Sequence, residues 1–225
     1  MKLWHDKPYY PISQYYRDLF GEKVYKLSVS VADTCPNRLG LKNMETCVFC
    51  DEWGSAAYPE IREQNLKAQI SQTLERIQKR YKAQKFLVYF QSYTNSFMGV
   101  QKLEEHYNTA LEFPEVAGIV IGTRPDCLSP SLLKLWKKMS EHTHVSIELG
   151  VQTFREDLLR YLKRGHSHQT SLDAIQKIHN ETGLDIGLHF IFGIPGETPE
   201  DIQQMAQETS QLPITNVKFH NLHVL

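Results

Sequence analysis

The chain has 225 residues, of which 41% are hydrophobic, so it holds enough apolar material for one sizeable core and shows no compositional mark of disorder. Its 25 basic and 26 acidic residues give a formal net charge of -1, which excludes a global field that would attract nucleic acid or an anionic membrane. Any contact with RNA must therefore come from a local patch.

The predicted elements begin after an N-terminal extension, residues 1–23, which we expect to pack on a core domain formed by residues 24–225. From residue 24 onward, apolar or β-branched runs alternate with helical periodicity. The runs predict six strands at Val24–Val31, Phe86–Phe90, Gly118–Gly122, His144–Leu149, Ile186–Ile194 and Val217–Leu225. The helical segments between them are Ile61–Tyr81, Leu103–Leu111, Ser131–Met139, Phe154–Leu162, Ser171–His179 and Pro199–Leu212.

Local signals at helix ends agree with this division. Ser129-Pro130 and Thr198-Pro199 each place an N-cap residue before a proline at the first helical position. Gly183 is expected to end a helix just before the fifth strand.

Strands that alternate with helices predict right-handed βαβ units and a parallel sheet, either open and doubly wound or closed into part of a barrel. Polar residues follow the strand ends, as in barrel enzymes, which favours the α/β fold of a partial (β/α)6 TIM-like barrel. They occur at Asp33–Cys35, Gln91–Asn95, Thr123–Asp126, Glu148–Gln152 and Gly193–Glu197. The sixth strand runs to the last residue, so we expect a covering C-terminal helix to be missing from this chain, as in a fragment of a longer protein.

Four cysteines in a chain of this size do not predict a disulfide scaffold, and the tight pair Cys47 and Cys50 suits reduced, metal-binding thiols. Cys35, Cys47 and Cys50 form a C-x11-C-x2-C pattern in a loop after the first predicted strand. Three thiolates would leave one iron of a [4Fe-4S] cluster free to bind a further ligand. Cys127 is expected to be an ordinary half-buried residue, and Phe49 to shield the cluster.

The alternative is a zinc site made of the three cysteines and a histidine such as His166 or His5, in a non-catalytic nucleic-acid or protein binding module. The loop position favours the cluster, because a zinc knuckle generally supports a small fold, whereas this loop lies at the mouth of a barrel with its own core. A thioredoxin-like redox role is less favoured, since the pair does not open a helix in a compact βαβ unit.

Several motifs, taken in order, resemble the YhcC/YtqA-like family of radical S-adenosylmethionine (SAM) proteins, relatives of the Elongator catalytic subunit. The first are the run Phe20–Lys26, Thr34–Arg38 and Cys47–Cys50. The others are Gln91–Asn95, Gly122–Asp126, Glu148–Gln152, Arg164–His166 and Gly193–Thr198. The resemblance implies a partial (β/α)6 barrel that cleaves SAM to a 5′-deoxyadenosyl radical for hydrogen abstraction.

The resemblance also implies roles for individual residues. Cys35, Cys47 and Cys50 would ligate the cluster, and Arg164 would pair with the methionyl carboxylate of SAM. Glu148 and Gln152 would bind the ribose hydroxyls. The residues implied for the methionyl amino group are Gln91, Ser92, Tyr93, Thr94 and Asn95, and those for adenine are Gly193, Ile194 and Pro195.

Some of these residues have simpler interpretations. Glu148 could pair with Arg164 or Arg124 inside the barrel, since a buried carboxylate usually finds a cation. His166 and His189 are more simply structural, although His189 lies on a strand face expected to line the lumen and so is a candidate to touch substrate.

The chain also departs from the family pattern. Val31–Asp33 and Glu45-Thr46 stand where relatives have glycine-rich residues, and Leu39 replaces a customary acidic residue, so the substrate of typical members is not carried over directly to this chain. By analogy with Elongator, whose acetyltransferase segment this chain lacks, the expected substrate is a tRNA wobble uridine.

Three basic segments could contact phosphates but are more simply solvated surfaces: Arg76–Lys85, Lys134–Lys138 and Arg160–Arg164.

The expected partners and location follow from this chemistry. A reductase such as flavodoxin or ferredoxin would donate the electron. Met1 to Tyr10 lacks the apolar run of a secretory signal, and no stretch suits a membrane-spanning helix. We therefore expect a cytoplasmic protein without membrane contact.

Overall fold

The computed structural model describes residues 7–223 and contains one sheet of six parallel strands, in the order β1-β2-β3-β4-β5-β6. The strands are β1 (Val24–Val29), β2 (Lys85–Phe90), β3 (Val116–Thr123), β4 (His144–Gln152), β5 (Asp185–Phe192) and β6 (Asn216–Asn221). All six predicted strands are confirmed. The last one ends before the predicted Leu225, and residues 224–225 lie outside the described part of the chain.

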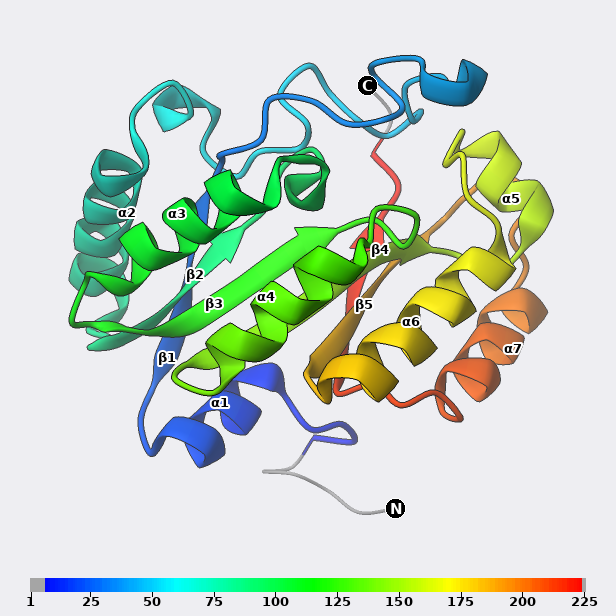
Figure 1. Ribbon diagram of the computed structural model, residues 1–225. Coiled ribbons are helices and arrows are strands. Elements are labelled where there is room, and N and C mark those ends of the chain that lie inside the picture. The colour runs from blue at the N-terminus through cyan, green and yellow to red at the C-terminus, as the bar shows by residue number, and fades with distance from the viewer. Residues whose placement is uncertain (1–6, 224–225) are drawn as a thin grey trace.

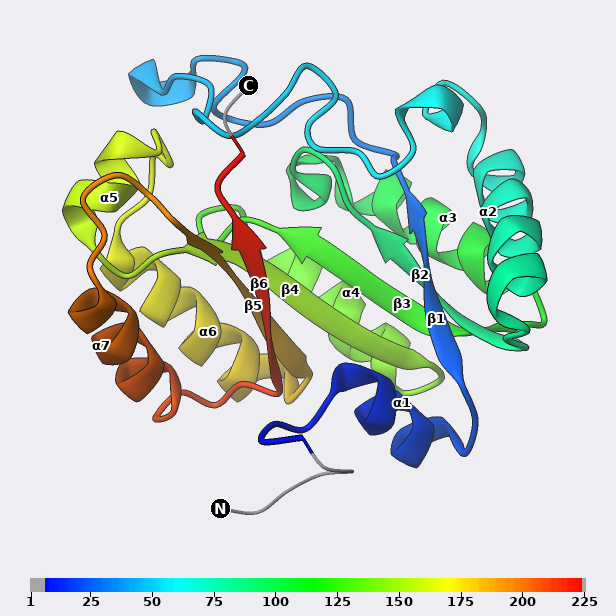
Figure 2. The same cartoon turned by 180° about the vertical axis from the view of Figure 1, so that it is seen from behind.

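The sheet curls into an open half-barrel with helices on its outer face (Figure 1). Seen from behind, the inner face lies between β1 and β6, which do not pair with each other (Figure 2). The helices are α1 (Ile12–Phe20), α2 (Leu66–Tyr81), α3 (Val100–Leu111), α4 (Pro130–Ser140), α5 (Glu156–Tyr161), α6 (His168–Thr182) and α7 (Pro199–Thr209). Short 3-10 helices occur at η1 (Leu41–Asn43), η2 (Pro59–Ile61) and η3 (Asn95–Phe97). The predicted partial barrel is thus confirmed.

The strands carry two different faces because successive side chains alternate across a sheet. Outward residues such as Val88, Ile121 and Ile147 are fully buried in the core that the sheet forms with the outer helices, where Trp136 and Tyr107 are the largest buried side chains. The inward residues include polar ones, so the lumen is where chemistry can occur.

The expected helix ends are present. The Ser129 side chain accepts a hydrogen bond from the Leu132 N–H, Thr198 forms a capping box with Asp201, and Gly183 ends α6 with a φ of 68°. The helix predicted over 61–81 is divided, because Asn65 caps a new start at Leu66.

α1 is absent from the helices predicted above. It is a nine-residue helix that ends at Gly21, with a φ of 75°, and its apolar residues lie mainly on one face, so the sequence does carry a signal for it. Tyr16 packs from inside the lumen on Leu87, Tyr89 and Val120, so α1 closes the amino-terminal end of the barrel (Figure 2). Tyr15 contributes to the same closure, since its hydroxyl donates to Asp185 at 2.5 Å.

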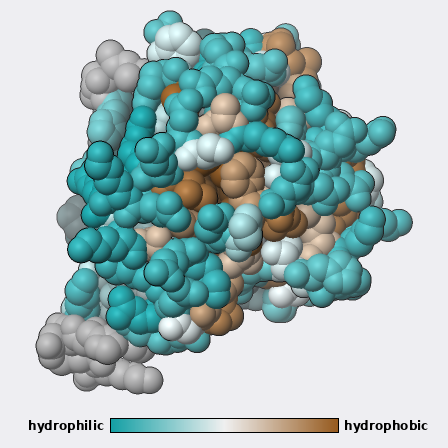
Figure 3. All heavy atoms as spheres, turned by 90° about the vertical axis from the view of Figure 1, so that its left-hand side faces the viewer, coloured by the Kyte–Doolittle hydropathy of each residue, from teal (hydrophilic) through white to brown (hydrophobic). Residues whose placement is uncertain are grey.

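One face of the surface shows how polar and apolar residues are distributed. The face on the α2 side is mostly hydrophilic, with hydrophobic residues gathered in its middle (Figure 3). Within residues 7–223, no helix is long and apolar enough to cross a membrane.

Candidate active site

A cavity of about 400 Å³ lies at the carboxyl ends of the strands, beneath the loop that joins β1 to α2. Ten residues proposed from the sequence line it: Cys35, Cys47, Cys50, Gln91, Ser92, Tyr93, Thr94, Glu148, Gln152 and Arg164. Four others do not: Asn95, Gly193, Ile194 and Pro195. The fold therefore brings together side chains from β4, from the cysteine loop and from the turns after β2 and α5.

The three cysteines of the loop are free thiols that face this cavity, with Cys35 and Cys47 buried and Cys50 half-buried. Arg164 donates to the Cys47 sulfur at 3.5 Å, and Arg38 donates to the Cys50 sulfur at 3.6 Å. Burial raises the pKa of Cys50, while Arg38 acts in the opposite direction by favouring the thiolate.

This donor set fits an iron–sulfur cluster, because three reduced sulfurs share one cavity and two guanidinium groups offset the negative charge that a cluster brings. In the described part of the chain, no three His, Cys, Asp or Glu side chains stand close enough to hold a single metal ion. Cys127 is half-buried and does not line the cavity, and burial beside Asp126 raises its pKa to about 12.

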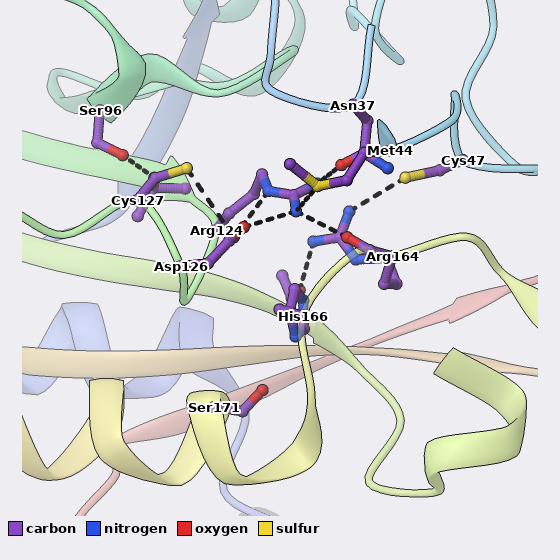
Figure 4. Close-up of polar contacts among 12 residues, drawn as sticks. Asn37, Met44, Cys47, Ser96, Arg124, Asp126, Cys127, Arg164, His166 and Ser171 are labelled. Carbon is purple, nitrogen blue, oxygen red and sulfur yellow. Dashed lines mark hydrogen bonds and ion pairs between the residues drawn. The ribbon is translucent and has the colours of Figure 1, made fainter. Parts of the chain in front are cut away.

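Arg124 ties the cysteine loop to the barrel (Figure 4). It pairs with Asp126 at 2.8 and 2.9 Å, donates to the Arg164 carbonyl at 2.7 Å, and donates to the side-chain oxygen of Asn37. Asn37 in turn donates to the carbonyls of Glu45 and Lys163, both at 2.6 Å. Arg124 belongs to the motif Gly122–Asp126, but the sequence pattern does not predict this contact with Asn37.

Glu148 is 2% exposed and is paired inside the barrel with Lys26 and with His189, the latter at 2.6 Å. Its partners are therefore neither Arg164 nor Arg124, the two that the simpler interpretation named. Burial raises the pKa of Glu148, but the hydrogen bond from His189 and the charge of Lys26 together hold it well below its usual range. Gly187 makes room, because a Cβ there would lie 3.1 Å from the Glu148 Cγ.

Gln152 and Arg164 meet over Gly150. A bulge after Leu149 gives Gln152 a φ of 73°, a left-handed conformation that the sequence did not reveal. Arg164 donates to the Gly150 carbonyl at 2.8 Å, and its buried Nε has no hydrogen-bond partner within residues 7–223. A donor in that position can serve a ligand in the cavity.

The turn after β2 has two residues in the left-handed region, Ser92 with a φ of 71° and Tyr93 with a φ of 47°. Asn95 holds this turn from behind, since its amide donates to the carbonyls of Phe90 at 3.0 Å and of Gly122 at 3.1 Å. The buried hydroxyls of Ser92 and Thr94 find no partner in the described residues, although both residues line the cavity. These oxygens are therefore suited to accept from an ammonium.

The loop after β5 lies just outside the cavity. Gly193 has a φ of 80°, and its N–H donates to Glu197 at 2.8 Å. Ile194 is buried in a small cluster with Leu158 and Leu162, on which Phe49 packs. Phe49 itself lines the cavity, so this cluster supports the cavity wall.

The histidines have different surroundings. His166 does not line the cavity, and burial, together with the charge of Arg164, lowers its pKa to about 3. His189 does line it. His5 lies outside the described residues, so its place in the zinc alternative is a matter of sequence alone.

Known proteins share both the sequence and the fold. The pattern of the Radical SAM superfamily matches residues 29–209. YtqA of Bacillus subtilis is 30% identical over 220 residues, 98% of this chain and 68% of its own length. YhcC of Escherichia coli K12 is 30% identical over 92% of this chain and 65% of its own. The chain thus spans about two thirds of the length of these relatives.

More distant similarity comes from two further proteins. A tRNA uridine(34) acetyltransferase of Methanocaldococcus jannaschii is 30% identical over 95 residues, 42% of this chain and 17% of its own length. The structure of the radical SAM enzyme coproporphyrinogen III oxidase (HemN) of Escherichia coli superposes with a TM-score of 0.59 at 16% identity, over 91% of this chain and 45% of that one.

These matches decide between the two sequence hypotheses. The superfamily pattern covers most of the chain, including all three loop cysteines, and it leaves no support for a non-catalytic zinc module. The chain belongs to the radical SAM superfamily, in its YtqA/YhcC-like group, and is an enzyme of the class that uses a [4Fe-4S] cluster and SAM.

Proposed function

We propose that this enzyme abstracts hydrogen from a nucleoside of tRNA, with the wobble uridine as its target. The observation that carries the proposal is the partial similarity to tRNA uridine(34) acetyltransferases. Because this similarity covers only 17% of the acetyltransferase, it supports a shared radical domain and does not extend to acetyl transfer.

The cofactors would supply the reactivity: an electron from the reduced cluster cleaves SAM into methionine and a 5′-deoxyadenosyl radical. Under this proposal, Cys35, Cys47 and Cys50 hold the cluster and leave one iron for SAM. The hydroxyls of Ser92 and Thr94 accept from the methionyl ammonium, since both are buried at the cavity without a described partner.

The remaining SAM contacts follow the geometry of β4 and its neighbours. Arg164 can turn its unpartnered Nε toward the methionyl carboxylate. Glu148 and Gln152 both line the cavity and carry the acceptors and donors that ribose hydroxyls need. Gly193, Ile194 and Pro195 remain our proposal for adenine, approached from the edge of the cavity.

Aromatic and cationic groups at the cavity support a nucleoside substrate. The Arg62 guanidinium lies 5.5 Å from the ring centre of Trp53 and 5.3 Å from that of Tyr93. Trp53 is 39% exposed, and Tyr93 lines the cavity. The partly exposed Trp53 ring can stack on an unpaired base, the form in which single-stranded RNA is usually recognised.

We further propose that a flavodoxin or ferredoxin reduces the cluster, as radical SAM enzymes need a reductant. A cytoplasmic location, where thiols stay reduced, is part of the same proposal.

The proposal is tested in two steps. First, the reduced, cluster-loaded protein should release 5′-deoxyadenosine from SAM, whereas the Cys47→Ala variant should not. Second, nucleosides of tRNA from cells with and without the gene are compared by mass spectrometry, with the Cys47→Ala gene as the matched control. A wobble-uridine derivative should disappear in both the deletion and the Cys47→Ala strain. An unchanged set of wobble-uridine derivatives would remove the wobble uridine as the target, and an unchanged set of all tRNA nucleosides would remove tRNA as the substrate.

A further inference from the structure

The inner wall of the cavity opposite the cysteine loop is formed by β6. Alternation along this strand turns Lys218 and His220 toward the lumen and leaves Val217 and Phe219 exposed on the other face. Lys218 and His220 both line the cavity, together with Asn221 at the end of the strand.

Charge does not balance in this part of the lumen. Glu148 is the one carboxylate among the cavity-lining residues, and it is already paired with Lys26 and hydrogen-bonded to His189. Within residues 7–223 the ammonium of Lys218 forms no ion pair and no hydrogen bond, and the charge of Glu148 acts on it only from beyond ion-pair distance. Its described contact is the face of Tyr89, whose ring centre lies 4.9 Å away and also has Lys26 at 5.0 Å. Two ammonium groups, those of Lys26 and Lys218, therefore lie near one carboxylate, and only Lys26 forms an ion pair with it.

The neighbouring histidine adds an unused donor. The Nε2 of His220 is buried and has no hydrogen-bond partner in the described part of the chain. Burial lowers the pKa of His220 to about 4, so its ring is neutral near pH 7 and can donate one N–H. Burial also lowers the pKa of Lys218, which indicates that its charge is poorly solvated.

Lys218 is half-buried, and a partly desolvated cation that forms no ion pair costs free energy, which an anion bound beside it offsets. We propose that Lys218 and His220 bind an anionic oxygen group of the substrate, a phosphate or a carboxylate, inside the reaction cavity. The ammonium supplies the charge, and the imidazole supplies a directed hydrogen bond. This site deepens the proposed function, because it fixes the part of the substrate that the barrel holds. It rests on the cavity being the reaction chamber and not on tRNA being the substrate.

The test measures anion binding without any tRNA, so that its failure is separate from a failure of the tRNA proposal. Isothermal titration calorimetry is performed anaerobically on the cluster-loaded protein saturated with SAM, with methyl phosphate in one arm and acetate in the other. The variants are Lys218→Met, which removes the charge at similar length, and Lys218→Arg, which keeps it. Lys102→Met is the matched control, because Lys102 is exposed on α3 and does not line the cavity.

We expect the wild-type protein to bind at least one probe, and Lys218→Met to bind it at least about tenfold more weakly, the usual loss for a charge-assisted hydrogen bond. Lys218→Arg and Lys102→Met should stay within about threefold of the wild type. Binding of methyl phosphate alone would identify a phosphate group, and binding of acetate alone a carboxylate. Circular dichroism checks folding, and Lys218→Gln replaces Lys218→Met if the latter does not fold.

Three results would overturn the proposal. One is that the wild-type protein binds neither probe, and another is that Lys218→Met binds both as the wild type does. The third is a loss of SAM affinity of about tenfold or more in Lys218→Met, which would assign Lys218 to the methionyl carboxylate of SAM.

Discussion

The Arg38 guanidinium donates a hydrogen bond to the Cys50 sulfur over 3.6 Å, and it also donates to the carbonyl of Asp51 next in the chain. It lies over the ring of Tyr93, 5.1 Å from the ring centre. The Asp51 carbonyl and the Tyr93 ring thus hold Arg38 in place beside Cys50, one of the three cluster cysteines. A positive donor at a ligand sulfur stabilises the more negative, reduced form of an iron–sulfur cluster.

Replacing Arg38 with methionine should therefore make the cluster harder to reduce. The expected shift of the reduction potential is roughly 60 mV to more negative values, equivalent to about 1.4 kcal/mol for one electron. A redox titration followed by electron paramagnetic resonance measures it. Arg17→Met, on the exposed side of α1, is the control and should leave the potential unchanged. A potential in Arg38→Met equal to that of the wild type would show that this contact does not tune the cluster.

Alanine at Cys35, Cys47 or Cys50 should each abolish the cluster, because a cubane held by two protein sulfurs loses the ligand set that the cavity provides. The iron content and the visible absorption after anaerobic reconstitution report the result. Cys127→Ala is the matched control, since Cys127 does not line the cavity, and it should retain the iron of the wild type. Retention of full iron content in any one of the three loop variants would remove that cysteine from the ligand set.

Asp126→Asn should destabilise the protein by about 2–3 kcal/mol near pH 7, because it takes away the charged partner that Arg124 contacts through two hydrogen bonds. Burial raises the pKa of Asp126, but Arg124 outweighs it and lowers the pKa below its ordinary value of 3.8. The folded state therefore binds this proton less readily than the unfolded state. The stabilisation is present above about pH 4 and is lost as the pH falls through the folded pKa.

Urea denaturation at pH 7 and at pH 3 checks this linkage. The difference in unfolding free energy between wild type and Asp126→Asn should be largest at pH 7 and should shrink at pH 3, because below the ordinary pKa of 3.8 the unfolded wild-type chain binds a proton at Asp126 more readily than the folded state does. A difference that grows on acidification would contradict the assigned direction of the pKa. Asp157→Asn, an exposed partner of Arg155, should have an effect within about 1 kcal/mol at both values.

Gly150→Ala should weaken SAM binding by about tenfold or more, because the added Cβ would lie 2.8 Å from the Gln152 Nε2 and 3.3 Å from an Arg164 nitrogen. Both side chains would have to move away from their places at the cavity. Equilibrium binding of SAM to the cluster-loaded protein measures the effect. At Gly99 a Cβ would meet nothing within 4 Å, so Gly99→Ala should bind SAM as the wild type does. Equal SAM affinities of Gly150→Ala and Gly99→Ala would show that the side chains around Gly150 do not contribute to SAM binding.

Local patterns in the sequence were enough to predict the strands, most of the helices and the end of the sheet at which the site lies. Phe86–Phe90 is a continuous apolar run, and Val24–Val29 is an apolar run interrupted by Lys26 and Ser28. Parallel pairing of such segments between helices allows only a few topologies. The spacing of Cys35, Cys47 and Cys50 left a zinc site open, and their loop position together with the family motifs indicated the iron–sulfur cluster. A loop following a strand of a parallel barrel must lie at the carboxyl edge.

The partners of the site residues could not be predicted in this way. Glu148 meets Lys26 from β1 and His189 from β5, and Arg124 meets Asn37 from the cysteine loop. The left-handed conformation of Gln152 depends on a bulge in the pairing of β4 with β5.

The sequence by itself therefore determined which elements form and where their ends gather, because hydrophobic periodicity, caps and turn residues act over a few neighbouring positions. Only the tertiary structure decided which charges are paired and that Lys218 forms no ion pair within residues 7–223. The contacts of Glu148 and Arg124 join residues 41 to 122 positions apart, and their energies depend on the distance and burial that the curled sheet imposes.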